Sequence, residues 1–459
     1  MAIVDEFGYR LPLSVASANV DAGNGNLILS FRDGAGLSLA GHGRYDADLL
    51  NALLGNGATH AQLMALAGDE TDQYVPGFLR SLALRQALEW FFGPPEQPLC
   101  HLQSYSGTYC PMLIALPAAA LRLPLSRFVS LRRHGDAAIL DNPEVHARLT
   151  VAPAGIKLLD GLFDPVAGQE TNNPFRGFLS CAGFLESPQP EPAARAAREF
   201  HDLQFHDATR QALGLRPIVK HDRLAGSYPK PSPEKPVMSS SRIVLPAPAD
   251  RSSPPFAQVL AARRSIRRPA FQPLRLDDLS TLLWQCFRAA GVPGRPDVRL
   301  WRPVPAGGAI HALEYYLGIR RCEGLESGFY HYREQEHALY RLPSRPALEQ
   351  RLNHTAAAAM GETGTPPDCV IVMASRHPLL ARGYEGIAYR LALLQAGVAM
   401  QTLYLVATAL GLAPCANGTG DSALFEALTG LSPFEETAIA EFALSGGPDE
   451  ADEENKESR

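Results

Sequence analysis

Residues 391–412, LALLQAGVAMQTLYLVATALGL, form one of the most apolar stretches of this 459-residue chain. Gln395 and Gln401 interrupt the run, so we interpret it as a core helix rather than a membrane span. A polar segment, RGYEGIAYR (residues 382–390), comes directly before it. Arginines, a tyrosine and a glutamate at the start of a buried helix predict that the chemistry lies there.

The bulk composition indicates a globular protein with several domains. The length suits about three domains, and 46% hydrophobic with 20% charged residues is ordinary for a soluble fold. A formal net charge of −6 argues against nucleic acid as a partner. The seven cysteines show no C-x-x-C motif and no metal-ligand spacing, so we expect reduced thiols in a cytoplasmic protein and no metal. The start, MAIVDEFGYR, shows no secretory signal.

The first 188 residues predict two small winged-helix-like modules, 1–108 and 109–188, in a degenerate tandem repeat. The first combines a hairpin at Asp33-Gly34, a helix stopped by Gly55, a capping box of Thr59 and Gln62, and a helix over residues 74–90. The second combines strands around residues 134–135 with helices over 152–163 and 173–187. The charges of residues 69–90 are mixed, so we favour peptide or protein recognition along a strand edge over DNA. The alternative is that the modules only pack against the rest of the chain.

Residues 189–256 predict one helix over 191–214 and then a linker or an extended arm wrapping a neighbour, because YPKPSPEKP, LPAPAD and SSPPF are dense in proline. Residues 257–447 form the third predicted domain. It contains a helix in LDDLSTLLWQCFRAAG, a strand in YYLGI, a hairpin turning at 333–336, and a doubly buried strand in CVIVMAS. The acidic tail, residues 448–459, is expected to be disordered.

Three segments of the last domain suggest one ligand. Arg263, Ser265 and Arg267 alternate on an extended segment, so their side chains share one side and suit a phosphate. The plain alternative is that these arginines face water. Glycines in PAGGAIHALE and LAPCANGTGD allow the backbone to approach a planar ligand, or else mark flexible turns.

Together these motifs resemble a known family. RRSIR, PAGGAIHALE, GFYHY, YEGIAYR and QTLYLVATALGLAPCANGTGDSALF look like the FMN-dependent nitroreductase superfamily. The most similar branch is the SagB/ThcOx-type (McbC-like) peptide dehydrogenases, which oxidise azolines in ribosomal peptides. The match covers the last 200 residues. The two N-terminal modules resemble, more loosely, the peptide-clamp domains that bind leader peptides.

The resemblance implies an α+β fold, in which a mixed sheet is flanked by helices, and an obligate homodimer with one FMN at each subunit interface. Residues 391–412 would then be a dimer-core helix. Its implied partners are a precursor peptide with a leader segment and, as an open option, a cyclodehydratase complex. The implied cofactor-binding residues are listed here: Arg263, Ser265, Arg267, Pro305, Ala306, Gly307, Gly308, Gly418 and Gly420.

The implied reaction is oxidation of a thiazoline or oxazoline to an azole, with proton transfer by Tyr384. Relatives carry a lysine directly before this tyrosine, whereas this chain has Gly383, and it has no lysine between Lys235 and Lys456. A neutral tyrosine is a poor base unless a cation lowers its pKa, and Arg382 or Arg390 would provide that cation.

Other assignments stay open. His311, His354 or His377 is an alternative base, and Tyr384 alternatively only packs. Ala306 is a second departure, since relatives commonly carry serine there. Two further functions remain as alternatives: an NAD(P)H-dependent nitroreductase acting on small molecules, and a non-catalytic leader-peptide-binding partner of a cyclodehydratase.

Overall fold

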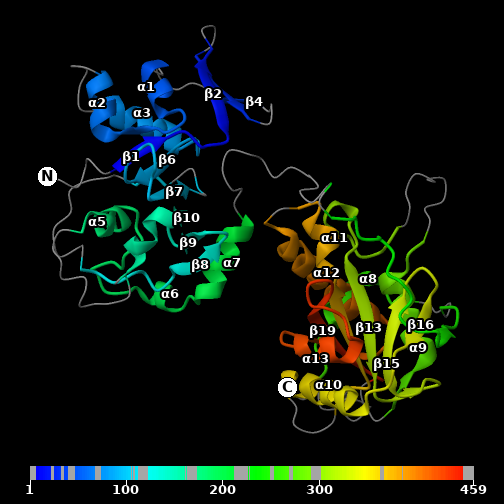
Figure 1. Ribbon diagram of the computed structural model, residues 1–459. Coiled ribbons are helices and arrows are strands. Elements are labelled where there is room, and N and C mark those ends of the chain that lie inside the picture. The colour runs from blue at the N-terminus through cyan, green and yellow to red at the C-terminus, as the bar shows by residue number, and fades with distance from the viewer. Residues whose placement is uncertain are drawn as a thin grey trace. The chain divides into compact units, whose positions relative to one another are not determined.

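The apolar stretch forms one 22-residue helix, α12 (Ala388–Ala409). In a computed structural model of the protein, the chain divides into two compact units, Met1–Val219 and Lys220–Arg459, and α12 belongs to the second (Figure 1). The structure describes residues 7–21, 25–32, 36–39, 47–67, 74–104, 106, 109–111, 122–160, 162, 173–210, 226, 228–248, 253–267, 272–290, 301–361, 366–384 and 386–447.

A seven-stranded sheet forms the centre of the second unit, in the order β11-β16-β15-β13-β17-β19-β18. All neighbouring strands in this sheet pair antiparallel, and the short β12–β14 pair is parallel. Every residue of β17 is buried, which confirms the doubly buried strand, and β15 and β16 form the expected hairpin. The strands are β11 (Arg242–Val244), β12 (Leu274–Arg275), β13 (Leu313–Ile319), β14 (Cys322–Glu323), β15 (Gly328–Arg333), β16 (Ala338–Arg341), β17 (Cys369–Ser375), β18 (Ala413–Asn417) and β19 (Thr437–Ser445).

Helices cover both faces of this sheet, which confirms the predicted α+β class (Figure 1). One face packs against α9 and α12 through Leu283 and Leu403, and the other against α10 and α13 through Leu352 and Phe425. The helices are α8 (Phe256–Ala262), α9 (Leu276–Phe287), α10 (Pro346–Ala359), α11 (His377–Ala381) and α13 (Ser422–Thr429), besides α12.

Helix α12 is not buried on every side within one subunit. Ala392, Ala399 and Leu403 are fully buried, but Leu394 is 56% and Val398 40% exposed. By length and composition alone, it is the one helix among the described residues that could cross a membrane. Its packing against α9, β18 and β19 is that of a core helix, which leaves one apolar stripe uncovered.

Residues 228–241 form a proline-rich strap on the second unit. Proline has no N–H, so a strap of this composition can be held mainly through its carbonyl oxygens. Arg376 donates to the carbonyls of Ser232 (2.6 Å) and Pro233 (3.0 Å), and Arg333 donates to that of Lys235 (2.7 Å).

The side chain of Lys235 anchors the strap. It pairs with the buried carboxylate of Glu436, which also accepts a hydrogen bond of 2.6 Å from Tyr316. The strap then leads into β11, which pairs with β16. The predicted proline-rich arm therefore lies on its own chain.

The first unit contains a second seven-stranded sheet, ordered β5-β1-β6-β7-β10-β9-β8, and the small sheet β2-β3-β4. The capping box is confirmed: Thr59 N–H donates to Gln62 Oε1 (2.8 Å), and Gln62 N–H donates to Thr59 Oγ1 (3.3 Å). The strands are β1 (Phe7–Arg10), β2 (Val15–Val20), β3 (Leu27–Phe31), β4 (Gly36–Leu39), β5 (Ala58–Thr59), β6 (Glu89–Phe92), β7 (Cys100–Ser104), β8 (Ser130–His134), β9 (Ala137–Asn142) and β10 (Ala147–Val151).

Several predicted helices of this unit have different limits. The helix expected over 74–90 ends at Ala83, because Glu89 already pairs with Arg10 in the sheet. Residues 152–163 contain a 3-10 helix, and the helix expected over 191–214 is split into α6 and α7. The helices are α1 (Ala47–Leu53), α2 (His60–Ala67), α3 (Tyr74–Ala83), η2 (Pro153–Leu159), α5 (Pro174–Cys181), α6 (Ala193–Ala196) and α7 (Phe200–Arg210).

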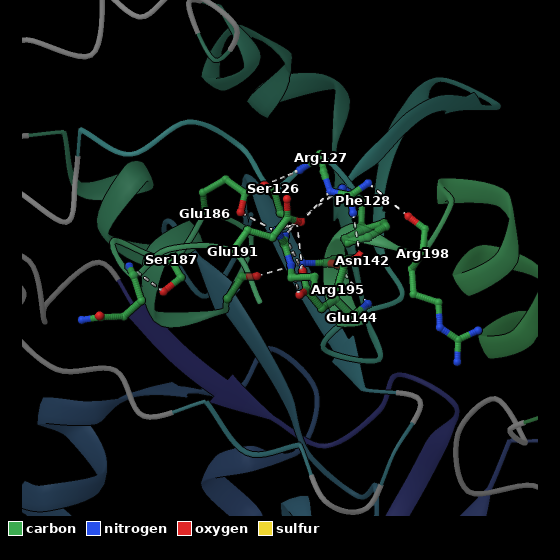
Figure 2. A network of polar contacts seen from close by, with 12 residues as sticks. Ser126, Arg127, Phe128, Asn142, Glu144, Glu186, Ser187, Glu191, Arg195 and Arg198 are labelled. Atoms are coloured by element: carbon green, nitrogen blue, oxygen red, sulfur yellow. Dashed lines mark hydrogen bonds and ion pairs between the residues drawn. The ribbon is translucent and has the colours of Figure 1, made fainter. Parts of the chain in front are cut away.

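One arginine fastens α6 to the first unit. Figure 2 shows the guanidinium of Arg195 among three glutamates, at 2.5 Å from Glu144, 3.0 Å from Glu186 and 2.7 Å from Glu191. Arg127 donates to the Arg195 carbonyl (2.7 Å). This cluster attaches α6 to the first unit, although the sequence analysis had assigned α6 to the separate segment 189–256.

The two predicted winged-helix modules share one sheet, because β7 pairs with β10 across the expected boundary at 108/109. Their winged-helix and peptide-clamp character stays a prediction, as do the other domain limits. The expected hairpin turn at Asp33-Gly34 and the tail 448–459 lie outside the described residues.

Candidate functional site

The predicted phosphate clamp follows α8. Arg263 caps the end of α8, and the Ile266 N–H donates to the Pro414 carbonyl of β18 at 2.9 Å. The guanidinium of Arg263 lies 5.2 Å from the ring centre of Tyr404 on α12. This contact is a cation–π interaction, which orients the charge without neutralising it.

Ser265 belongs to a short chain of hydrogen bonds. Its Oγ is 2.6 Å from the hydroxyl of Tyr404, and that hydroxyl accepts the Ala416 N–H at 2.8 Å. If Tyr404 donates its proton to Ser265, the Ser265 proton remains available for a ligand oxygen. The sequence analysis missed Tyr404, although a lone tyrosine in the apolar run 391–412 was a visible signal.

The clamp residues fit a phosphate-bearing cofactor. Arg263 and Arg267 form no ion pair with any carboxylate in the described ranges, and Arg264 donates only to the Ala262 carbonyl (3.1 Å). Arg267 is exposed and Arg263 half-buried. Guanidiniums that pair with no described carboxylate, beside a hydroxyl that can still donate its proton, are donors that bind a phosphate monoester such as that of FMN.

The loop Pro305 to Gly308 lies at the other end of α12. Its last residues form the single turn η4 (Gly307–Ala309), where Gly308 has φ 59°. A Cβ on Gly307 would lie 3.1 Å from Leu391, near the start of α12, so this loop packs closely on the helix. Pro305 and Gly308 are exposed. Ala306 is the N-cap residue of η4, and its side chain forms no hydrogen bond to that turn.

One subunit does not bring the loop and the clamp together. The loop contacts Leu391 and the clamp contacts Tyr404, and these positions are about 20 Å apart along the helix. In the predicted dimer, both groups would line the same cofactor where two subunits meet, and this arrangement stays a prediction.

Gly418 and Gly420 lie in the loop after β18, which lines a cavity of about 160 Å³. A Cβ on Gly420 would lie 2.8 Å from Oε1 of Glu441 on β19, so a larger residue at position 420 would force this carboxyl to move. Asp421 then caps α13 by accepting the Leu424 N–H (3.0 Å). The sequence analysis missed Glu441, whose signal was a single acid in the apolar strand TAIAEFALS.

The segment before α12 is arranged differently from the expectation. Tyr384 packs beside Ile310 and Leu391 in a small apolar cluster. Arg382 is buried, and its Nη1 donates to the carbonyls of Tyr228 (3.1 Å) and Pro229 (2.9 Å) in the strap. The assistance of Tyr384 by Arg382 stays a prediction, and Glu385 lies outside the described residues.

Gly383, the position where the resemblance expects a lysine, lies next to Ile310, two residues after the loop 305–308. A Cβ on Gly383 would lie 3.1 Å from Cδ1 of Ile310. Among the alternative bases, burial and, to a smaller extent, nearby Arg302 lower the pKa of His311 to about 4, so His311 is neutral at pH 7. His354 is exposed on α10, and the His377 ring is 6.3 Å from that of Tyr389.

The comparisons with known proteins identify the domain that carries these residues. The profile described as the nitroreductase family matches residues 260–443. A protein of Methanocaldococcus jannaschii that is named as a nitroreductase is 33% identical over 156 residues, which cover 34% of this chain and 73% of the relative. The chain belongs to the nitroreductase family.

This nitroreductase-family domain contains the clamp, both glycine loops and α12, while the first unit lies outside the match. Members of the family typically bind flavin, so the domain is that of a flavin-dependent oxidoreductase. A Ralstonia eutropha structure described as a nitroreductase shows 20% identity and a TM-score of 0.38, covering 50% of this chain and 99% of that one. A chain of the E. coli microcin synthetase McbBCD complex with truncated pro-MccB17 bound shows 19% identity and a TM-score of 0.33, covering 49% and 86%.

Proposed function

We propose that this nitroreductase-family protein is a cytoplasmic, FMN-dependent oxidase that converts azolines to azoles in a ribosomally made peptide. Arg263 and Arg267, which pair with no carboxylate among the described residues, and the Ser265 hydroxyl, which can donate while it accepts from Tyr404, carry the flavin part of the proposal. The sequence motifs shared with SagB/ThcOx-type peptide dehydrogenases support the substrate class. We propose a homodimer as the working form.

The first unit supports a peptide substrate. The family match leaves out all of it, and the edge strand β8 borders a cavity of about 450 Å³. Leu131 and Ile156 are 43% and 40% exposed there, beside Arg132 and Arg133. Among the described residues no strand pairs with the outer edge of β8, and such an edge beside apolar side chains suits an extended peptide, which would add as a further strand. A leader segment is the occupant that we propose.

The proposal gives each predicted site residue a role. Arg263, Ser265 and Arg267 would hold the FMN phosphate and ribityl chain, Pro305 to Gly308 would line the isoalloxazine ring, and Gly418 and Gly420 would close the site. Bound FMN supplies a hydride acceptor. Tyr384, at the start of α12, takes part in proton transfer from the substrate.

The proposal is tested on the purified full-length protein. We expect bound FMN with its visible absorption, and a loss of two mass units per ring when an azoline-bearing precursor peptide is added under air. Tyr384→Phe should keep FMN and lose turnover. Flavin bound without any mass loss would contradict the azoline assignment.

A second candidate, reduction of small molecules by NAD(P)H, is favoured by the 33% identity to the M. jannaschii relative. Rapid bleaching of the flavin by NADPH alone, without peptide, would select it. A colourless protein that binds precursor peptide would instead indicate a non-catalytic partner of a cyclodehydratase.

A further inference from the structure

The cavity beside Gly418 contains a carboxyl group that no motif assigned. Its walls come from three elements and a loop: Tyr389 on α12, Asn417 at the end of β18, Ile439 and Glu441 on β19, and the Gly418–Gly420 loop. Ile439 also packs on the apolar cluster that holds Tyr384. The cavity therefore adjoins the start of α12, where the sequence placed the chemistry.

Glu441 is built into this cavity. It is 3% exposed and pairs in register with Asn417 across the two strands. Its Oε1 fills the space that a side chain at position 420 would take. Its Oε2 has no hydrogen-bond partner among the described residues, and neither has Oδ1 of Asn417. Two buried oxygens without partners in one cavity point to a ligand that supplies hydrogens.

The pKa of Glu441 is raised to about 7, and burial is the largest cause. The negative charge of Asp421 adds to this increase, while the Asp421 backbone N–H and the Asn417 amide oppose it. Asp421 is itself paired with Arg351 of α10 at 2.7 Å, and Tyr389 is the titratable group that α12 contributes. No lysine, arginine or histidine belongs to the described lining of the cavity.

We propose that Glu441 is the catalytic base of this site and takes the role that relatives give to the lysine before Tyr384. The inference rests on the proposed azoline oxidation. Oε2 takes the proton from Cα of the azoline, and the electrons of that bond form the Cα=Cβ double bond. One hydrogen leaves Cβ with its electron pair to oxidised FMN, and dioxygen later reoxidises the reduced flavin. The products are an azole, a protonated Glu441 and reduced flavin, and reoxidation of the flavin would convert dioxygen to hydrogen peroxide.

The test uses the full-length FMN-loaded protein with Glu441→Gln, Glu441→Asp and, as a matched control, Glu426→Gln on α13, which lies outside the cavity. Glu441→Gln keeps the shape of the side chain and the acceptor at Oε1. We expect unchanged FMN content and at least a ~100-fold loss of kcat on the azoline peptide, with KM changed less than about threefold. Glu441→Asp should recover part of kcat with a shifted pH profile.

A spectroscopic measurement reports on the same carboxyl without turnover. The flavin absorption of the wild type should shift with pH around 7, and Glu441→Gln should abolish the shift while Glu426→Gln retains it. Wild-type kcat in Glu441→Gln would overturn the inference and leave azoline oxidation standing. A wild-type protein without FMN or without mass loss would overturn the proposed function itself, and the inference with it. If Glu441→Gln does not fold, an Asp variant with wild-type kcat and pH profile would overturn the inference.

Discussion

At the scale of single residues, variants in the hydrogen-bond chain of Ser265, Tyr404 and Ala416 should separate effects on FMN affinity from effects on the free energy of unfolding. Tyr404→Phe removes the acceptor of the Ala416 N–H, so we expect a loss of about 1–2 kcal/mol in the free energy of unfolding, together with weaker FMN binding. Ser265→Ala leaves that N–H satisfied and should weaken FMN binding with a much smaller stability change. Urea unfolding and FMN titration measure both. Equal destabilisation by the two variants would contradict this assignment.

The raised pKa of Glu441 also predicts how stability depends on pH. The native state keeps the proton up to about pH 7, whereas the unfolded chain loses it near the ordinary value of 4.5. The unfolded state therefore binds fewer protons between these values, and the unfolding free energy falls as pH rises through this window. The loss approaches about 3 kcal/mol and levels off above pH 7.

Unfolding of the flavin-free protein in urea, measured from pH 4.5 to 8, checks this dependence. Glu441→Gln cannot ionise, so the difference in stability between wild type and variant should change by about 3 kcal/mol over the window. Other groups titrate equally in both proteins and cancel in the comparison. A difference that stays constant with pH would show that Glu441 ionises at its ordinary pKa.

At the scale of elements, the strap depends on one buried ion pair. Lys235→Met leaves Glu436 buried with only Tyr316 as a partner, so we expect a loss of about 3–5 kcal/mol. Adding Glu436→Gln removes the uncompensated charge and should recover most of the loss. A double-mutant cycle by urea unfolding measures the coupling. A cost below about 1 kcal/mol for Lys235→Met would indicate that the strap is not anchored there.

Elements defined by residues close together in sequence could be predicted well. The limits of other elements depend on contacts between residues far apart in sequence. The capping box of Thr59 and Gln62 and the hairpin at residues 333–336 involve neighbours in sequence, so their side chains and turns could be recognised. The end of α3 depends on Glu89 pairing with Arg10, 79 residues away. The break between α6 and α7 accompanies the Arg195 cluster, whose partners begin at Ser126, 69 residues before it.

The candidate site shows the same division. The clamp and glycine loops were recognisable because each is a contiguous motif. Tyr404 and Glu441 acquire their roles only because β18 lies beside both α12 and β19. Arg382 was assigned to Tyr384 because only Gly383 separates them in sequence, whereas the fold brings a strap from residue 228 to its guanidinium.

At the scale of the whole molecule, the uncovered stripe of α12 predicts the oligomeric state. Tyr389, Leu394 and Val398 are exposed on α12, and α8, which packs against it, exposes Phe256 and Leu260. Apolar side chains gathered on packed helices are typical of a subunit interface. A second copy covering this stripe would also bring its loop 305–308 to the clamp that lies about 20 Å from it within one chain.

Val398→Asp tests this arrangement, because it places a charge where the two copies would bury an apolar side chain. We expect a monomer by size-exclusion chromatography with light scattering, and at least a ~100-fold weaker FMN affinity, since each site would lose the loop of the partner. Leu131→Asp, at a comparably exposed position of the first unit, should leave both the dimer and its flavin intact. A monomeric variant that binds FMN as tightly as the wild type would mean that one chain completes the site, and that the loop 305–308 has no part in it.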